Sequence, residues 1–426
     1  MDKLTYIDLF AGAGGLSEGF VRKGFIPVAH VEMDQAACFT LKTRAAYKYL
    51  KDNNQNNDYV SYLKGKISRA ELYSLVPSEL LESVINLPIG EEFNETIHRV
   101  IKKQLQGQKV DLIIGGPPCQ AYSIVGRARS ENKMKGDPRN YLYVQYGKYL
   151  DKYKPKMFVF ENVMGLKSAK GGFYLENMEL LFGKKGYKMQ LFTVEADKFG
   201  VLQNRKRIII LGWRKEFTAN IPDLDKIDLS NDFKVGSIFS DLPFLNGGQG
   251  TDKYQQYQKT PCKYINDKQI RNGVNVITQH IARSNTKQDK EIYRIVVNKW
   301  DNEKKRLDYN DLPDRLKTHQ NRHSFFDRFK VVAKELPYSQ TVVAHISKDG
   351  HYYIHPDIEQ NRSITVREAA RLQSFPDDYY FEGVKEDAFQ TPAFRQIGNA
   401  VPPLMAEEIA SIIKRILRKG EPLLLK

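Results

Sequence analysis

Cysteine is scarce in this sequence, and long apolar runs are absent. The 426 residues include three cysteines, Cys38, Cys119 and Cys262, whose positions fit neither a disulfide framework nor a zinc site. No apolar stretch is long enough to cross a membrane, and the first residues lack the pattern of a signal peptide. We therefore expect a protein of the reducing cytoplasm that has no bound metal and no membrane partner.

Acidic residues are outnumbered by basic ones. The chain has 66 Lys and Arg against 51 Asp and Glu, so its formal net charge is +15. This charge suits a polyanionic partner such as nucleic acid, although many soluble proteins are basic. The length predicts about two to three domain-sized units, and the 41% hydrophobic share excludes a disordered chain.

Short apolar runs alternate with helical stretches in the first half of the chain. Most are continuous rather than alternating with polar residues, which is typical of strands buried on both faces of a mainly parallel sheet. The expected strands are residues 6–10, 27–31, 110–114, 157–160, 191–194 and 207–212. The pattern predicts an α/β, Rossmann-like domain whose ligand site lies at the strand tips.

This rhythm ends near residue 215. A polar stretch rich in Asn, Gln, Tyr and Lys continues to about residue 360, which indicates a second domain or a large insertion. Within it, residues 339–356 alternate enough to predict a hairpin around Asp349-Gly350. Helices are expected again at residues 365–375 and 404–417.

One cysteine follows a Gly-Gly-Pro-Pro turn at the end of an expected strand, in residues 111–120. A strand tip in an open α/β sheet faces the ligand crevice. A cysteine nucleophile attacks as a thiolate, which requires partial exposure and electropositive neighbours. Cys119 is therefore a candidate nucleophile, and the alternative is a buried structural cysteine at a tight turn.

Three glycines separate the first strand from the next helix. Gly12, Gly14 and Gly15 let the backbone turn tightly and approach a ligand. Ser17 stands where the nicotinamide-cofactor fingerprint requires a further glycine, and Glu32 follows the second strand, where an acid commonly accepts ribose hydroxyls. These residues predict a nucleotide-like cofactor, and the alternative is a tight turn with a solvated glutamate.

Two more polar clusters adjoin strands. Glu161 ends one apolar strand, and the cations Arg205, Lys206 and Arg207 begin another. Each cluster alone could be a helix cap or a surface feature. A thiol, a carboxylate and a guanidinium that converge on one cofactor cleft are hard to explain structurally, so together they predict a catalytic site.

With these motifs in this order, the sequence resembles the DNA (cytosine-5) methyltransferase family of the prokaryotic restriction-modification type. The resemblance covers residues 4–214 and 363–403. Its markers are the loop at 10–15, Gly-Pro-Pro-Cys-Gln at 116–120, Glu-Asn-Val at 161–163, Gln-Asn-Arg-Lys-Arg at 203–207 and the segments 367–376 and 396–402. It implies a catalytic domain at residues 1–214 that is completed by residues 361–426, with an inserted, smaller target-recognition domain at 215–360.

The resemblance also implies S-adenosylmethionine as the cofactor. The implied binding residues are Phe10, Ala11, Gly12, Gly14, Gly15, Leu16, Glu32, Met33, Pro118, Asn399 and Val401. The family's third cofactor motif usually offers an aspartate to the adenine amine, but Gly65-Lys66-Ile67 has lysine there, which leaves Asp58 or no side chain. Residues from about 68 to 108 then look like an inserted, partly helical element of unknown role.

The family's reaction is covalent. Cys119 would add to carbon 6 of cytosine, Glu161 would hold ring nitrogen 3 and the exocyclic amine, and Arg207, with Arg205, would bind the base carbonyl oxygen. The base must be flipped out of the duplex to reach these groups. A basic loop follows the nucleophile, where the DNA-binding candidates are Gln120, Ser123, Arg127 and Arg129.

Target recognition is expected in the basic middle of the chain. Residues 253–330 carry 18 Lys and Arg against 9 Asp and Glu. The candidate base readers are Arg283, Asn285, Arg322, His323 and Arg328, although any one is more often a phosphate or solvent contact. The implied partner is double-stranded DNA, bound by a monomer. A restriction endonuclease is the implied functional partner, and the prokaryotic cytoplasm or nucleoid is the implied location.

Three other functions remain open at this point. A transfer RNA cytosine-5 methyltransferase of the same superfamily would keep the same catalytic residues, although the large basic domain favours DNA. A catalytically idle nucleic-acid-binding homologue is disfavoured because Cys119, Glu161 and Arg207 are all retained. A nicotinamide oxidoreductase is disfavoured by the glycine spacing.

Overall fold

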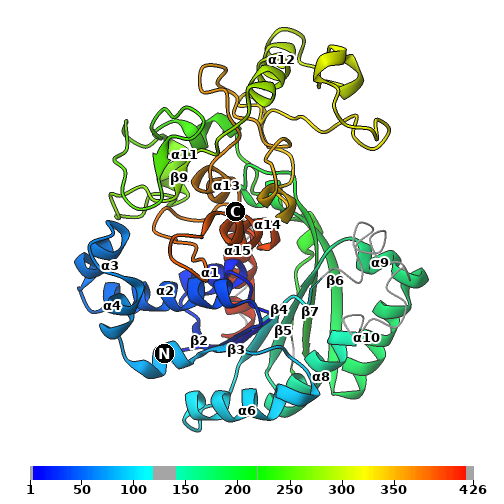
Figure 1. Cartoon of the computed structure of the whole chain (residues 1–426). Helices are drawn as coiled ribbons and strands as arrows, with labels where there is room; N and C mark the ends of the chain where they lie inside the picture. The colour runs from blue at the N-terminus through cyan, green and yellow to red at the C-terminus, as the bar shows by residue number, and fades with distance from the viewer. Residues whose placement is uncertain (1–2, 119–140, 218, 419–426) are drawn as a thin grey trace.

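The computed structural model describes residues 3–118, 141–217 and 219–418 (Figure 1). A single seven-stranded sheet forms the centre of the lower part, in the order β3-β2-β1-β4-β5-β7-β6. Its strands are β1 (Thr5–Leu9), β2 (Ile26–Glu32), β3 (Val84–Asn86), β4 (Leu112–Gly115), β5 (Met157–Asn162), β6 (Tyr187–Glu195) and β7 (Lys206–Arg214). Strands β1 to β5 pair in parallel, and β7 pairs antiparallel with β5 and β6. The mainly parallel sheet and all six expected strands are confirmed.

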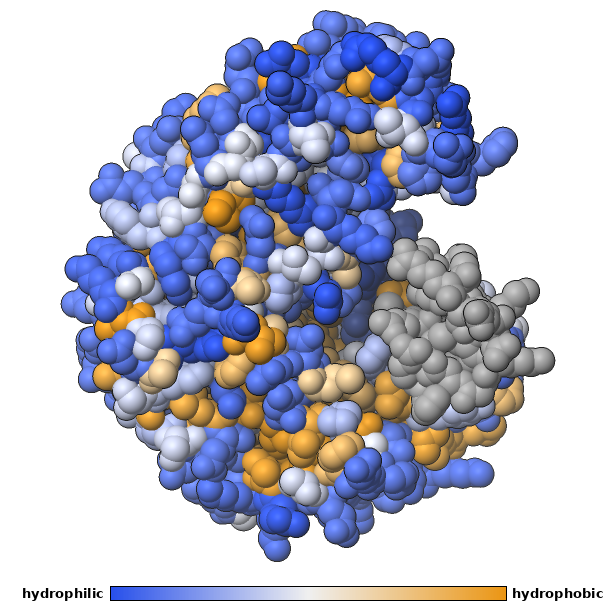
Figure 2. All heavy atoms as spheres, viewed as in Figure 1, coloured by the Kyte–Doolittle hydropathy of each residue, from blue (hydrophilic) through white to orange (hydrophobic). Residues whose placement is uncertain are grey.

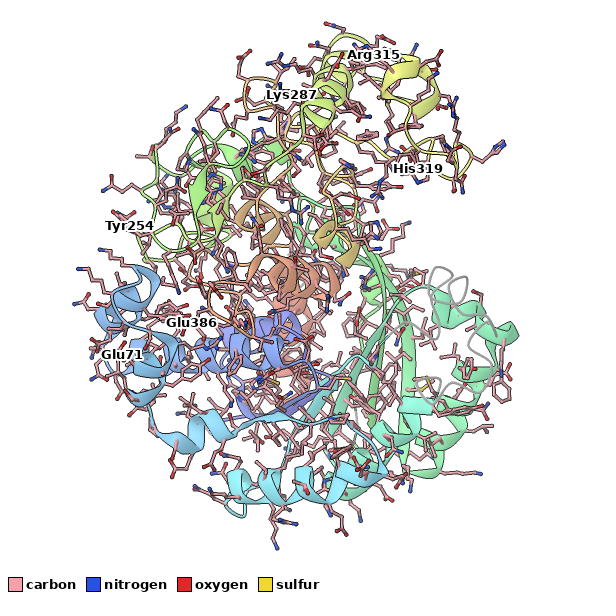
Figure 3. All side chains as sticks on the ribbon, viewed as in Figure 1. Glu71, Tyr254, Lys287, Arg315, His319 and Glu386 are labelled. Atoms are coloured by element: carbon pink, nitrogen blue, oxygen red, sulfur yellow. The ribbon has the colours of Figure 1, made fainter. Side chains whose placement is uncertain are left out.

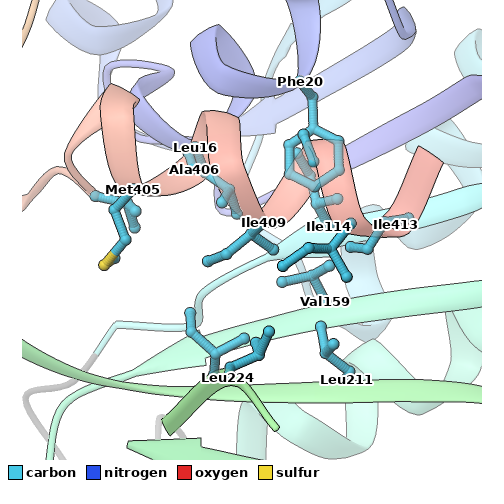
Figure 4. Packing of buried hydrophobic residues seen from close by; sticks show 14 of the residues in the cluster. Leu16, Phe20, Ile114, Val159, Leu211, Leu224, Met405, Ala406, Ile409 and Ile413 are labelled. Atoms are coloured by element: carbon cyan, nitrogen blue, oxygen red, sulfur yellow. The ribbon is translucent and has the colours of Figure 1, made fainter. Parts of the chain in front are cut away.

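Helices cover both faces of this sheet. Side chains alternate along a strand, so Phe158 and Phe160 of β5 point to one face while Met157 and Val159 point to the other. The first face packs against α6 (Glu91–Leu105), α8 (Leu142–Tyr153) and α10 (Phe173–Lys184). The second packs against α1 (Gly15–Arg22) and α15 (Pro403–Leu417), as Figure 4 shows. Burial on both faces explains why the strands read as continuous apolar runs.

The C-terminal segment returns to complete this domain. It forms α13 (Val366–Leu372), α14 (Gln390–Asn399) and α15, in agreement with the helices expected from the sequence. Helix α15 crosses α1 so closely that a Cβ on Gly19 would lie 2.3 Å from the backbone nitrogen of Glu407. The second face of the sheet is therefore covered by one helix from near each end of the described chain, α1 and α15.

The stretch after β2 is only partly a surface elaboration. Residues 35–82 form the helices α2 (Gln35–Asp52), α3 (Asn56–Leu63), α4 (Arg69–Ser74) and α5 (Ser78–Glu82). The following strand β3 joins the sheet edge beside β2, and α6 crosses back over the sheet. The expectation that residues 68–108 are one peripheral insertion is therefore wrong from residue 84 onward. Strand β3 has only three residues, Val-Ile-Asn, which is too short a run to mark a strand in the sequence.

The middle of the chain forms the upper part of Figure 1 from short and irregular elements. They include β8 (Gly250–Thr251), β9 (His280–Ile281), α11 (Lys263–Asp267) and α12 (Lys287–Glu303). Residues 292–358 enclose an apolar cluster of their own, which contains Ile292, Val296, Leu312 and Phe329. We call residues 286–331, which supply most of this cluster, the upper lobe.

The expected hairpin at residues 339–356 is wrong. Residues Ala344–Ser347 form a turn of 3-10 helix, and the chain reverses at Gly350, whose carbonyl accepts from the Tyr353 backbone nitrogen. Ile354 instead pairs with Val331 and Ser363 in isolated bridges. The two ends of this stretch still meet, through hydrogen bonds between Tyr353 and the backbone of Thr341 and Val343, but they do not form paired strands. In the described part of the chain, no helix is both long and apolar enough to span a membrane.

Candidate active site

The glycine loop after β1 is tied to the tip of β2. Gly12 and Gly14 have φ of 55° and 79°, and Phe10 also has a positive φ of 58°, a conformation that costs a non-glycine residue energy. The Gly12 backbone nitrogen donates to Oε2 of Glu32 over 2.8 Å. A Cβ on Gly12 would meet no atom of the described residues within 4 Å, so among these residues the loop is open beside the Glu32 carboxylate. Burial raises the pKa of Glu32, while hydrogen bonds from Asp34 and Gly12 lower it.

The returning C-terminal segment closes over the same loop. A Cβ on Gly15 would lie 2.3 Å from the Val401 carbonyl oxygen and 3.1 Å from Ala400. Asn399, at the end of α14, is exposed, whereas Val401 is buried. The structure therefore brings the predicted cofactor residues Gly12, Glu32 and Gly15 together with Val401.

The other predicted cofactor residues differ in exposure. Leu16 is buried in the core between the sheet and α15, so it supports the loop from below. The Met33 side chain, just past β2, is 65% exposed. Phe10, Ala11 and Pro118 are half-buried.

The tip of β3 carries a residue that the sequence reasoning missed. Asn86 lies opposite Glu32 in the parallel register and donates to the carbonyl oxygens of Glu32 (3.2 Å) and Met33 (3.0 Å). The segment Gly65-Lys66-Ile67, compared above with the family's third cofactor motif, follows the helix α3 and not a strand. The placement of that motif is therefore corrected: Asn86, not residue 66 or Asp58, stands at the third strand tip.

Glu161 meets Arg207 at the tips of β5 and β7. The Nε of Arg207 lies 2.9 Å from Oε1 of Glu161, and both side chains are less than 15% exposed. Gly116 follows β4 at the same edge of the sheet, and a Cβ there would lie 2.5 Å from Oε2 of Glu161. Burial raises the pKa of Glu161, and the two arginines Arg207 and Arg205 oppose this rise.

The turn that leads to Cys119 is anchored beside this carboxylate. The Asn162 side chain donates to the Pro117 carbonyl oxygen over 3.2 Å, and Asn162 is buried. Asn162 is a second residue whose role the sequence did not reveal, because a buried amide at a strand end has no distinctive pattern. Cys119 itself lies outside the described residues, as do the loop residues Gln120, Ser123, Arg127 and Arg129.

Arg205 has a different position from the one expected. It is fully buried, and its guanidinium donates to the carbonyl oxygens of Val342 (2.7 Å), Gly398 (3.0 Å) and Ala400 (2.8 Å). A guanidinium with no exposed surface has no free face for a base carbonyl. The expected direct base contact is therefore corrected to a positioning role, in which Arg205 holds the returning segment in place.

The three arginines among the candidate base readers also differ in whether the guanidinium is engaged within the protein. Arg283 donates to the Ile346 carbonyl oxygen and its guanidinium lies 4.2 Å from the centre of the Phe394 ring. Arg328 pairs with Asp349 and lies over the Phe325 ring. Arg322, by contrast, is exposed in the upper lobe.

The geometry can serve a group-transfer reaction. An open, glycine-lined site beside a carboxylate lies at the tips of β1 and β2, and a carboxylate–guanidinium pair lies at the tips of β5 and β7. Strands β4 and β5 place Gly116 and Glu161 side by side at the same edge. Within the described ranges, no group of three His, Cys, Asp or Glu side chains could hold a metal ion.

Comparison with known proteins agrees with this geometry. The family described as C-5 cytosine-specific DNA methylase matches residues 4–68 and 85–415. The type II methyltransferase M.Bpa9945I of Bacillus paralicheniformis is 42% identical, over 97% of this chain and 99% of its own length. The type II methyltransferase M.DdeI of Desulfomicrobium norvegicum is 30% identical, over 96% of this chain and 88% of its own.

Solved structures share the fold. A prophage-encoded E. coli protein described as a DNA modification methyltransferase has a TM-score of 0.64 at 22% identity, with 98% of this chain and 100% of the other covered. The Entamoeba histolytica methyltransferase EhMeth has a TM-score of 0.53 at 11% identity, with 97% and 98% covered. From the family match over nearly the whole sequence, the chain belongs to the C-5 cytosine-specific DNA methylase family and is a DNA (cytosine-5) methyltransferase.

Proposed function

We propose that the protein transfers a methyl group from S-adenosylmethionine to carbon 5 of a flipped cytosine in a specific duplex DNA sequence, through a covalent adduct with Cys119. One observation carries the proposal. The carboxylate of Glu161 lies against Gly116, three residues before Cys119, and is paired with Arg207. An acid and a guanidinium therefore lie beside the Gly-Gly-Pro-Pro turn that precedes Cys119 in the sequence, which supports the proposal.

The cofactor, when bound, supplies an electrophilic methyl group. The residues at the tips of β1 and β2 fit it: Gly12 leaves open space beside Glu32, whose carboxylate suits ribose hydroxyls. Asn86, at the next strand tip, has its amide oxygen left to accept from an adenine amine, because its nitrogen donates to backbone carbonyls. Asn399 and Val401 would close the pocket from the returning segment.

The chain's own groups act on the base. The Cys119 thiolate would attack carbon 6, which makes carbon 5 nucleophilic enough to accept the methyl group. Glu161, whose raised pKa favours a shared proton, would hold ring nitrogen 3 and the exocyclic amine. Arg207 would bind the carbonyl oxygen and balance the charge that develops in the ring. Loss of the carbon 5 proton then expels Cys119 and restores the aromatic ring.

The cellular role is proposed from the relatives and the charge. Relatives along the full chain are named type II methyltransferases, so we propose that the protein protects host DNA from a restriction endonuclease in the prokaryotic cytoplasm or nucleoid. The excess of Lys and Arg in residues 253–330 supports a target-recognition domain at 215–360 that binds the duplex as a monomer.

The test is covalent trapping on modified DNA. Fluorine at carbon 5 does not leave as a proton does, so wild-type protein with cofactor should form a denaturation-resistant complex with duplexes that carry 5-fluorocytosine. Cys119→Ala should form none, although its melting temperature should still rise with S-adenosylmethionine. A parallel assay with transfer RNA tests the RNA alternative. Absence of an adduct with wild type on active duplexes would overturn the mechanism.

A further inference from the structure

The upper lobe carries a shallow depression of about 400 Å³, lined by Asp308, Asn310, Arg322, His323 and Phe326. We call these five residues the reading pocket. Their two segments are joined by a 2.8 Å hydrogen bond from the Tyr309 backbone nitrogen to the Phe326 carbonyl oxygen. In Figure 3, His319 lies at the right of the upper lobe, and the upper lobe is largely hydrophilic on the face that Figure 2 shows.

The pocket rests on an ordered aromatic base. The rings of His319 and Phe325 stack with centroids 3.9 Å apart, and Tyr309 meets Phe325 edge-on at 4.9 Å. The Tyr309 hydroxyl also accepts from the His319 backbone nitrogen. Against this base, Phe326 remains 50% exposed. The aromatic cluster thus holds the Phe326 side chain at the surface beside the polar groups of the pocket.

The polar side chains of the pocket differ in how many of their hydrogen-bonding groups are already used within the protein. The Asn310 amide donates to Oδ1 of Asp308, so part of its capacity is used. In contrast to Arg283 and Arg328, the Arg322 side chain forms no hydrogen bond and no ion pair with any residue that the structure describes. Oδ1 of Asp308 accepts from the backbone and side-chain nitrogens of Asn310, and its Oδ2 has no hydrogen-bond donor among the described residues. The pocket therefore presents an unpaired guanidinium fork together with one remaining carboxylate oxygen.

We propose that the reading pocket recognises a G·C base pair of the target sequence, with Arg322 donating to O6 and N7 of the guanine. The proposal rests on the proposed function in duplex DNA. A guanidinium fork matches the two acceptors of guanine in the major groove, and a carboxylate such as Asp308 matches the amine donor of the paired cytosine. Asn310 keeps one amide N–H and its oxygen, so an A·T pair is the alternative that the test must distinguish.

The test measures the sequence profile of methylation on duplexes that carry every single base-pair change around the target cytosine. Arg322→Ala is compared with Arg322→Lys, which keeps the charge but cannot form a bidentate contact. The matched control is Arg294→Ala, an exposed arginine on α12 in the same lobe, which likewise has no hydrogen-bond or ion-pair partner among the described residues. Thermal melting verifies that each exposed variant is folded.

With Arg322→Ala, discrimination at one G·C position should fall by about tenfold or more, and Arg322→Lys should not restore it. Arg294→Ala should keep the wild-type profile. An unchanged profile with Arg322→Ala, a relaxed A·T position, or full rescue by lysine would each overturn the proposal. Wild type that methylates none of the duplexes would instead overturn the proposed function, so the two failures are distinguishable.

Discussion

Glu161 and Arg207 form a 2.9 Å ion pair across two antiparallel strands of the central sheet. Glu161 lies opposite Ile209 of β7. Arg207 comes two residues before Ile209, so its side chain points to the same face of the sheet. The pair therefore follows from strand register, and it leaves the second carboxylate oxygen, Oε2, next to Gly116. Under the proposed function, that oxygen would meet the base at the turn before Cys119.

Glu161→Gln tests the carboxylate. The amide keeps the size of the side chain but cannot share a proton with ring nitrogen 3, so methylation should fall by about 10²- to 10⁴-fold. Single-turnover methylation of a short duplex measures the rate. Cofactor binding, followed by the melting temperature with and without S-adenosylmethionine, is the control and should change little. A variant with nearly wild-type turnover would exclude Glu161 from the chemistry.

Arg207 and Arg205 provide a matched pair. Arg207→Ala should lower the rate of methylation, and its loss of stability should be the smaller of the two, because Glu161 can take up a proton when its half-buried partner is removed. Arg205→Ala removes the guanidinium donor of the Val342, Gly398 and Ala400 carbonyl oxygens, of which Ala400 keeps a second donor in Gln373. It should therefore lower the free energy of unfolding by about 3 kcal/mol. Urea denaturation and single-turnover kinetics separate the effects. Equal stability losses in both variants would contradict the assignment.

The sequence predicted the sheet well because its strands are buried on both faces and are therefore continuously apolar. It missed β3, whose three residues carry too little pattern. The sequence could not show that Arg205 is buried while Arg207 pairs with Glu161. The carbonyl oxygens that bind Arg205 lie 137 to 195 residues away in the chain. It also misjudged residues 339–356, where Ile354 pairs with segments on either side rather than within a hairpin.

Gly19→Ala tests the contact between α1 and α15. The new Cβ would lie 2.3 Å from backbone atoms of Glu407, which cannot rotate away. The variant should lose about 1 to 3 kcal/mol of stability. Gly183→Ala on α10 is the control, because nothing lies within 4 Å of its Cβ position, and it should be neutral or stabilising. Denaturant unfolding of both variants is the measurement, and an equally stable Gly19→Ala would contradict the close packing.

His30 predicts a loss of stability in mild acid. It is buried on β2, where its Nε2 is hydrogen-bonded to Ser17, and burial lowers its pKa from 6.5 to about 4. The folded state therefore favours the neutral ring. The unfolded state binds a proton at His30 below pH 6.5, and the folded state does so only near pH 4. The free energy of unfolding is therefore highest above pH 6.5, and it falls by at most about 3 kcal/mol as the pH falls towards 4.

Unfolding free energies of wild type and His30→Gln between pH 7 and pH 4.5 provide the measurement. Other buried histidines, such as His280 and His355, also have lowered pKa values, but they are common to both proteins. The variant should show a shallower decline with acid. Parallel curves for the two proteins would mean that His30 does not titrate in this range.

The upper lobe should transfer sequence specificity to another member of the family. Its apolar cluster is separate from the one that joins residues 235–265 to α13, where Asp241 forms a buried ion pair with Arg371. Replacing residues 286–331 with the matching segment of a relative that methylates another sequence should therefore keep the fold and the catalytic site. Bisulfite sequencing should then report methylation at bases read by the donor lobe.

Exchange of all of residues 215–360 is the informative comparison. That exchange also removes Asp241, and it leaves the Arg371 guanidinium buried without one of its two carboxylate partners unless the donor supplies an acid at this position. We therefore expect the larger chimera to lose stability, whereas the lobe exchange should not. If the lobe exchange left the methylated sequence unchanged, recognition would lie outside residues 286–331. The next segment to exchange would then be α4 and α5, at residues 69–82, because the family match omits residues 69–84.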